Sequence, residues 1–263
     1  MKLHFISGLP RSGSTLLCNI LAQNPRFYTS TTSGILDVLF GIRNRWDGLI
    51  EFQTIPQADS EAAKLRVLRG ALRGYYAHIK KPVVFDKSRG WLAHLEMTEA
   101  ILNRKVKVLV TVRDIRDVLA SFEKLWRQAS AVRQISGEAE NYFQFQTCEG
   151  RCAFWSQADQ PVGLGYNRVK DALDRGYGDR IHFVEFEKLT QYPRREMQRV
   201  YRFLDEKHYA HDFDNVKQTV FENDRIHGFD NMHTIRPQVK PMEPQYPHIL
   251  NGVSEKYQGL EVW

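Results

Sequence analysis

A glycine-containing loop near the N-terminus is the first feature of the chain that could do chemistry. The apolar run Leu3–Ser7 leads directly into Gly8-Leu9-Pro10-Arg11-Ser12-Gly13-Ser14-Thr15, and a helical pattern follows. A strand, a glycine loop and a helix in this order bind phosphate, because the N–H groups of the loop and of the helix N-terminus converge on the anion. We therefore expect an anion site here rather than a merely structural turn. The residues expected to bind are Arg11, Ser12, Gly13, Ser14 and Thr15.

The loop matches only half of the motif found in nucleotide kinases. The spacing of Gly8 and Gly13 is that of a Walker A loop, but Ser14 stands where that loop has its lysine. Kinases and NTPases hold the β- and γ-phosphates with this lysine. Its absence argues against ATP or GTP chemistry, and the cation of the loop is Arg11 instead. A P-loop kinase or phosphotransferase remains one alternative, and a nucleotide-binding protein without catalysis is another.

A lysine follows a second strand-like run. Pro82–Asp86 is apolar along most of its length, and Lys87 comes directly after it. Ligands of an open parallel sheet bind beyond the carboxyl ends of its strands. Lys87 is therefore expected to reach the same pocket as Arg11. The alternative is a solvated charge at the end of a strand.

An arginine and a serine follow the third strand-like run. Arg113 comes directly after Val106–Val112, and Ser121 lies two helical turns further on. The guanidinium fork suits phosphate oxygens, and the serine hydroxyl can add a donor. The competing interpretation of Arg113 is a salt bridge with Asp114 or Asp117.

The elements that must position these residues alternate between strand and helix. The strand-like runs are Leu3–Ser7, Pro82–Asp86, Val106–Val112 and Ile181–Phe186. Helical patterns cover Ser14–Gln23, Gly34–Arg45, Ser60–Ile79, Leu92–Asn103, Ile115–Gln128, Ala139–Gln157, Gly165–Arg175 and Arg194–Leu204. Mostly apolar strands indicate burial on both faces. We therefore predict a P-loop-like, three-layer α/β fold, with a central parallel sheet flanked by helices, as a single domain over residues 1–263. Four prolines predict that the C-terminal segment, about 235–263, is irregular.

Composition narrows the class of protein. Hydrophobic residues make up 42% of the chain and the formal net charge is +6, which excludes a disordered chain. The chain contains no run of five or six like charges, which argues against a nucleic-acid-binding tail. No apolar run approaches the ~20 residues of a membrane span. The N-terminus has no signal-peptide pattern, and three cysteines make no disulfide framework. These features predict a cytoplasmic protein. The oligomeric state stays open, with a homodimer among the alternatives.

At this point the chain resembles the PAPS-dependent sulfotransferases, and most closely the tyrosylprotein sulfotransferases and their bacterial relatives. PAPS is 3′-phosphoadenosine-5′-phosphosulfate. Gly8–Thr15 is similar to the family's 5′-phosphosulfate loop, and Lys87 to the catalytic lysine of the tyrosylprotein branch. Arg113 and Ser121 resemble the pair that binds the 3′-phosphate.

Two further segments carry the resemblance toward the C-terminus. Phe186-Glu187-Lys188-Leu189 is similar to a Tyr-Glu-Asp-Leu segment whose aromatic ring lies near the adenine. Ile235-Arg236-Pro237 resembles an Ile-Lys-Pro stretch whose cation reaches a cofactor phosphate. The resemblance therefore implies that Phe186 and Arg236 bind the cofactor.

The chain departs from the tyrosylprotein enzymes at their general base. Those enzymes have a glutamate pair about seventeen residues after the loop, and Thr31-Thr32 stand there in this chain. Threonine cannot take a proton from an acceptor hydroxyl near neutral pH. The nearest carboxylate is Asp37, which we expect to be the base, with His94 and Glu51 as other candidates.

The resemblance implies transfer of a sulfuryl group from PAPS to a hydroxyl or amine. The transfer would be in line, with Arg11 and Lys87 stabilising the leaving 5′-phosphate and Asp37 deprotonating the acceptor. Side chains supply the cations, so no metal is expected; His208 and His211 lack the partners of a metal site. The acceptor is a small molecule or a peptide.

Overall fold

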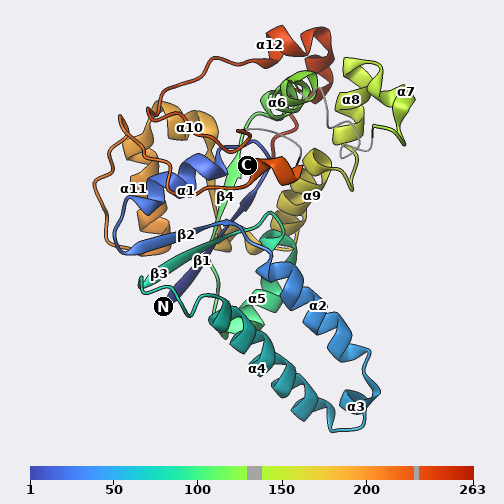
Figure 1. Cartoon of the computed structure of the whole chain (residues 1–263), viewed down its shortest axis with the longest axis vertical. Helices are drawn as coiled ribbons and strands as arrows, with labels where there is room; N and C mark the ends of the chain where they lie inside the picture. Colours follow the sequence, from blue (N-terminus) through green and yellow to red (C-terminus); the bar gives the residue numbers. More distant parts are fainter. Residues whose placement is uncertain (129–137, 228–230) are drawn as a thin grey trace.

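Parallel strands form one sheet in the computed structural model, which describes residues 1–128, 138–227 and 231–263. The described strands are β1 (Lys2–Gly8), β2 (Phe27–Thr32), β3 (Val83–Lys87), β4 (Val108–Val112) and β5 (Ile181–Glu185). Their order is β2-β3-β1-β4-β5, with every described pair parallel (Figure 1). All carboxyl ends therefore meet at one edge of the sheet.

Helices connect the strands and cover both faces of the sheet. The described α-helices are α1 (Ser14–Ala22), α2 (Ile35–Asp47), α3 (Ile50–Gln53), α4 (Gln57–Tyr75), α5 (Leu95–Leu102), α6 (Ile115–Gln128), α7 (Tyr142–Phe145), α8 (Cys148–Trp155), α9 (Pro161–Asp174), α10 (Phe186–Gln191), α11 (Pro193–Leu204) and α12 (Tyr246–Ile249). The described 3-10 helices are η1 (Trp91–His94), η2 (Tyr177–Arg180), η3 (Asp224–His227) and η4 (Asn251–Tyr257).

The core is divided by the sheet into two layers. Phe5 and Ile6 are both fully buried, yet they belong to separate hydrophobic clusters, because successive side chains of a strand point to opposite faces. Ile6 packs with α1, α10 and α11, whereas Phe5 packs with α2, α4, α5, α6 and α9. This burial on both faces explains the nearly continuous apolar strands. The predicted three-layer α/β fold is confirmed; the single domain over residues 1–263 stays a prediction.

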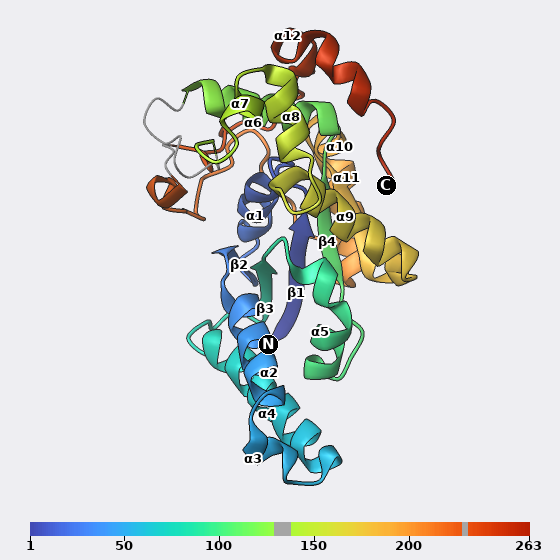
Figure 2. The ribbon, with the colours of Figure 1, turned by 90° about the vertical axis from the view of Figure 1, so that its right-hand side faces the viewer.

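A helical hairpin projects from this body. Helices α2, α3 and α4 extend away from the sheet, opposite to α12 (Figures 1 and 2). Near its tip the Trp46 and Phe52 rings stack with centroids 3.7 Å apart, and Lys64 pairs with Asp47 at 2.5 Å. No helix of the described residues has both the length and the apolar character needed to cross a bilayer.

The structure corrects several predicted boundaries. Strand β2 was not predicted, because it is threonine-rich and its last two residues are exposed. The predicted helix Ala139–Gln157 is two helices, α7 and α8, since the Thr147 hydroxyl accepts the Gly150 N–H (2.9 Å) and begins α8. Phe186 begins α10 instead of ending the last strand. The C-terminal segment is mostly irregular, as predicted, but contains α12 and η4.

Candidate active site

The glycine loop between β1 and α1 depends on unusual backbone geometry. Gly8 has a φ of 124°, and a Cβ there would lie 2.1 Å from the Thr111 carbonyl oxygen of β4. Gly13 has a φ of 87° and directly precedes α1. Arg11 has a φ of 57°, which is uncommon for a residue with a side chain. These turns wrap the chain around a point beyond the end of β1 and leave the first N–H groups of α1 facing it.

Ser12 holds the loop closed from beneath. Its buried hydroxyl lies 2.6 Å from the Leu9 carbonyl oxygen and 2.8 Å from the Thr111 hydroxyl. Its side chain therefore points into the protein. Any contact of Ser12 with an anion would come from its backbone N–H.

A cavity of ≈ 1400 Å³ opens at the carboxyl edge of the sheet. This exceeds the roughly 300–1,000 Å³ of a site for one small ligand, so the cavity has room for more than one small molecule. Most of the predicted site residues line the cavity: Arg11, Gly13, Ser14, Thr15, Lys87, Arg113, Ser121, Phe186 and Arg236. Ser12 and Asp37 are not among the lining residues.

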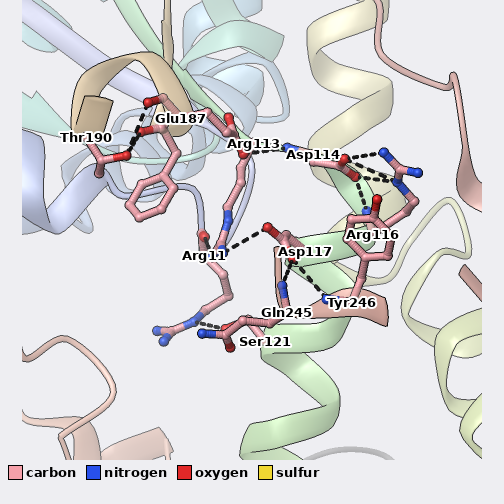
Figure 3. Close-up of polar contacts among 11 residues, drawn as sticks. Arg11, Arg113, Asp114, Arg116, Asp117, Ser121, Glu187, Thr190, Gln245 and Tyr246 are labelled. Carbon is pink, nitrogen blue, oxygen red and sulfur yellow. Dashed lines mark hydrogen bonds and ion pairs between the residues drawn. The ribbon is translucent and has the colours of Figure 1, made fainter. Parts of the chain in front are cut away.

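Arg11 reaches from the loop across the cavity floor. Its Nε donates to the Ser121 hydroxyl at 3.1 Å (Figure 3), and its Nη1 donates to the Met232 carbonyl at 2.7 Å. Burial and then the charge of Arg113 lower the pKa of Arg11, while Asp224 opposes them. The charges of Arg11 and Arg113, together with the N-terminus of α1, make this part of the cavity electropositive.

Arg113 lies at the end of β4 and is 7% exposed. Its Nη2 donates to Asp117 at 3.2 Å (Figure 3), and its Nη1 donates to the Arg11 carbonyl at 3.5 Å. Its guanidinium lies 4.6 Å from the Phe186 ring centroid. Asp117 is one of the two salt-bridge partners of Arg113 that the sequence suggests. The other carboxylate oxygen of Asp117 accepts the Gln245 and Tyr246 N–H groups. Among the described residues nothing accepts a hydrogen bond from the Arg113 Nε, although it is buried.

Phe186 forms one wall of the anion site. A Cβ on Gly13 would lie 2.6 Å from its ring, so glycine allows the ring to pack directly on the loop. The Thr190 hydroxyl donates to the Phe186 carbonyl (2.9 Å), and the Glu187 carboxylate accepts the Asp114 N–H (3.3 Å). These contacts fix the start of α10 against the end of β4 (Figure 3).

Lys87 ends β3 beside the loop. Its backbone N–H donates to the Ser30 hydroxyl (2.9 Å), which ties β3 to β2. The preceding Asp86 is fully buried and accepts hydrogen bonds from the Trp91 indole (2.8 Å) and the Tyr76 hydroxyl. Burial raises the pKa of the Asp86 carboxyl. The strand end is thereby rigid, and the Lys87 ammonium lines the cavity.

A carboxylate from the C-terminal segment contacts this lysine, and no sequence pattern predicts that contact. Glu222 forms an ion pair with the Lys87 Nζ and accepts the Thr32 N–H at 3.2 Å. His233 lines the same cavity, with its Nε2 3.8 Å from Glu222 and its Nδ1 hydrogen-bonded to Asp224. Glu222 is 135 positions from Lys87 in an irregular segment. No periodicity or motif spacing could have placed it there.

The other candidate bases lie outside the cavity lining. Asp37 is exposed in the first turn of α2, near the charges of Arg168 and His94. The His94 ring lies 5.0 Å from that of Phe40, and Glu51 is exposed on α3 at the hairpin tip. The role of Asp37 as general base stays a prediction, which mutation of Asp37 can test.

The cavity residues fit an adenosine bisphosphate. Within residues 1–128, 138–227 and 231–263 the buried Arg113 Nε has no acceptor and no side chain caps the start of α1, and phosphate oxygens are strong acceptors. The Phe186 ring offers an apolar face beside them for a base. Arg236 lines the same cavity and adds a further cation.

Structural comparison shows the same fold in solved sulfotransferases. The sulfotransferase domain from the curacin biosynthetic pathway matches with a TM-score of 0.53 and 15% identity, covering 99% of this chain and 91% of that chain. A sulfotransferase from Alicyclobacillus acidocaldarius matches with a TM-score of 0.51 and 16% identity, covering 99% of this chain and 94% of that chain. A search of curated proteins gave no match.

Comparison with protein-family models matches residues 3–259 to the sulfotransferase domain. The match includes the glycine loop, Lys87, Arg113 and the C-terminal segment that carries Glu222 and His233. Taken with the parallel sheet and the electropositive cavity at its carboxyl edge, this shows that the chain belongs to the sulfotransferase family.

Proposed function

We propose that this sulfotransferase transfers the sulfuryl group of PAPS to a hydroxyl or amine of a small-molecule or peptide acceptor. The observation that carries this proposal is the convergence of Arg11, Lys87 and Arg113 on one cavity beside a glycine loop without a Walker lysine. Such a site favours a nucleotide with charges at two separate positions. The kinase alternative is not favoured.

Each cavity residue takes a role that follows from its place. The N–H groups of Gly13–Thr15 and the Arg11 guanidinium would hold the 5′-phosphosulfate end. Arg113, with its free Nε, and Ser121 would hold the 3′-phosphate. Phe186 would lie against the adenine, and Arg236 would add a contact to a phosphate.

When bound, PAPS supplies the sulfuryl group and leaves as adenosine 3′,5′-bisphosphate (PAP). Lys87 is rigidly placed and would donate to the bridging oxygen, where negative charge builds. Arg11 and the loop N–H groups would share this charge. Loss of one such donor costs about 100- to 1000-fold in rate.

The remaining part of the cavity suits an acceptor. Its walls include the Phe154 and Trp155 rings of α8 and the side chains of Gln157 and Gln160. Aromatic faces bury an apolar part of the acceptor, while amides bond its polar groups. This lining is compatible with a phenol, a carbohydrate, a hydroxylated lipid or a tyrosine peptide.

We also propose the cytoplasmic location that the sequence predicts. Cys18, Cys148 and Cys152 are free thiols. Burial raises the pKa of Cys18 to about 11, which makes it inert. Free thiols suit a reducing compartment, and cell fractionation tests the location.

The direct test is turnover of PAPS. The protein would be incubated with PAPS and separate panels of phenols, sugars, lipid alcohols and tyrosine peptides. We expect PAP to form in equal amount to a sulfated product detected by mass spectrometry. Phosphorylated product from ATP and Mg²⁺, with no PAPS turnover, would support the kinase alternative instead.

A further inference from the structure

The C-terminal segment enters the cavity as a pinned loop. Two backbone hydrogen bonds close its base, from Val216 N–H to the Pro237 carbonyl (2.7 Å) and from Val239 N–H to the Phe213 carbonyl (2.8 Å). The Asn19 side chain of α1 accepts the Val220 N–H at 3.0 Å. The path of this segment from α11 to α12 crosses the carboxyl end of the sheet (Figure 1).

The two limbs of this loop are also tied together near the cavity. The Gln218 amide donates to the His233 carbonyl (3.2 Å) and accepts the Ile235 N–H (3.2 Å). Arg11 donates to the carbonyl of Met232, next to His233. Side chains on both limbs are therefore held in fixed positions relative to the glycine loop.

His233 and Asp224 form an oriented pair within this loop. Asp224 accepts both the His233 backbone N–H (2.9 Å) and the ring Nδ1–H. An ionised carboxylate only accepts, so in the neutral ring the contact with Asp224 assigns the proton to Nδ1 and leaves the lone pair on Nε2. Asp224 is 9% exposed and His233 19% exposed by side chain, so the pair is shielded, but the imidazole lines the cavity.

Glu222 connects this pair to Lys87. Its Oε1 pairs with the Lys87 Nζ, and its Oε2 lies 3.8 Å from the His233 Nε2. The same Oε1 accepts the Thr32 N–H at 3.2 Å, which holds the carboxylate against the end of β2. Burial disfavours the Glu222 anion, but Lys87 outweighs it and holds the Glu222 pKa below its ordinary value. A carboxylate so stabilised is a poor proton acceptor, whereas an imidazole exchanges a proton near neutral pH.

We propose that His233 is the general base of this enzyme, oriented by Asp224 and connected by Glu222 to Lys87. This inference rests on the proposed sulfuryl transfer. The acceptor oxygen would form its bond to sulfur as its proton passes to the His233 Nε2. The bond from sulfur to the bridging oxygen breaks, and the 5′-phosphate keeps the electron pair beside Lys87 and Arg11. Glu222 then lies next to the imidazolium and stabilises its charge.

The test compares His233→Asn, Asp224→Asn and Glu222→Gln with the parent, and His78→Asn serves as control because His78 is exposed on the surface. The first readout is the dissociation constant for PAP. The second is the single-turnover rate of PAPS with water as acceptor, which gives PAP and sulfate, from pH 5.5 to 9. The charged groups that face His233 or its partners are Asp224, Glu222, Lys87, Arg11 and Arg89.

We expect the parent rate to rise with pH through one ionisation. His233→Asn should lower the rate by about 100- to 10,000-fold and abolish that pH step, with PAP affinity within twofold of the parent. Asp224→Asn should slow transfer and move the step to lower pH, because the imidazolium loses its carboxylate partner. If Asp224 only stabilised the fold, its substitution would not change the pH at which the rate rises. An unchanged rate and pH profile in His233→Asn would overturn the proposal, as would a rate loss matched by an equal loss of PAP affinity.

A third readout needs no turnover. Nitrogen NMR of the free protein should show the Nδ1-protonated tautomer of His233, and Asp224→Asn should remove that preference. An Nε2-protonated ring in the parent would refute the assignment of the base. A parent protein that has this tautomer but neither binds PAP nor consumes PAPS would instead refute the proposed function.

Discussion

Replacing Arg113 by alanine should abolish the preference of the site for a 3′-phosphate. Among the described residues, the buried guanidinium has its Nη2 on Asp117, its Nη1 3.5 Å from the Arg11 carbonyl oxygen and no acceptor for its Nε. The Nε and the weakly bonded Nη1 can therefore give a 3′-phosphate about two charge-assisted hydrogen bonds. Such bonds contribute about 1.5–3 kcal/mol each. Even at the lower value, the loss is about 3 kcal/mol, or roughly 100-fold in Kd. AMP lacks this phosphate, so its Kd should change little.

Calorimetric titration of PAP and AMP against the parent and Arg113→Ala measures this directly. Arg66→Ala is a matched control, because Arg66 is exposed on α4. The Kd of Arg113→Lys for PAP should lie between those of the parent and of Arg113→Ala, because lysine keeps the charge but lacks the forked donors of a guanidinium. Asp117 keeps its two backbone donors in the variants, which supports folding. If Arg113→Ala prefers PAP over AMP as strongly as the parent does, the assignment of Arg113 to the 3′-phosphate is wrong.

Further predictions concern the leaving-group end of the site. Lys87→Ala should keep PAP binding but lose about 100- to 1000-fold in PAPS turnover. Lys80→Ala, which changes an exposed lysine, should turn over PAPS as fast as the parent does. Equal turnover in the two variants would remove Lys87 from the mechanism. Gly13→Ala should weaken PAP binding, because its Cβ would meet the Phe186 ring at 2.6 Å; unchanged affinity would contradict the close packing of loop and ring. PAPS turnover should persist in EDTA, and loss that Mg²⁺ restores would contradict side-chain charge neutralisation. Glu222→Gln should lower the melting temperature at pH 7, because the pKa of Glu222 is lower in the folded protein than in the unfolded chain. The difference should shrink as pH falls below about 4.3, and a difference that grows on acidification would contradict this.

The fold and the cofactor side of the site could be predicted from local sequence. Strands β1, β3 and β4 are buried on both faces, so each shows as an apolar run followed by its site residue, Gly8, Lys87 or Arg113. Parallel packing then brings those strand ends together. Strand β2 lacked this signal, since it is an edge strand with the sequence FYTSTT.

The acid–base side could not be predicted in this way. Glu222 reaches Lys87 from an irregular segment, and His233 lies beside Glu222. Their place depends on tertiary hydrogen bonds such as those of Asn19 and Gln218. The sequence had pointed to Asp37 because it is close to Thr32 along the chain, but that carboxylate is exposed on α2. Asp37 as general base therefore stays a prediction, beside the proposal for His233.

Thermal unfolding with added nucleotides tests the central claim most directly. PAP, AMP, and ATP with Mg²⁺ would each be added at ~100 times the dissociation constant for PAP, with and without EDTA. Saturation at that level adds about 2.7 kcal/mol of stability, which is roughly 5–10 °C in Tm for a chain of this size. We predict that shift with PAP, a much smaller one with AMP, and no effect of EDTA on the PAP result. A shift with ATP and Mg²⁺ but none with PAP would contradict a site built for PAPS.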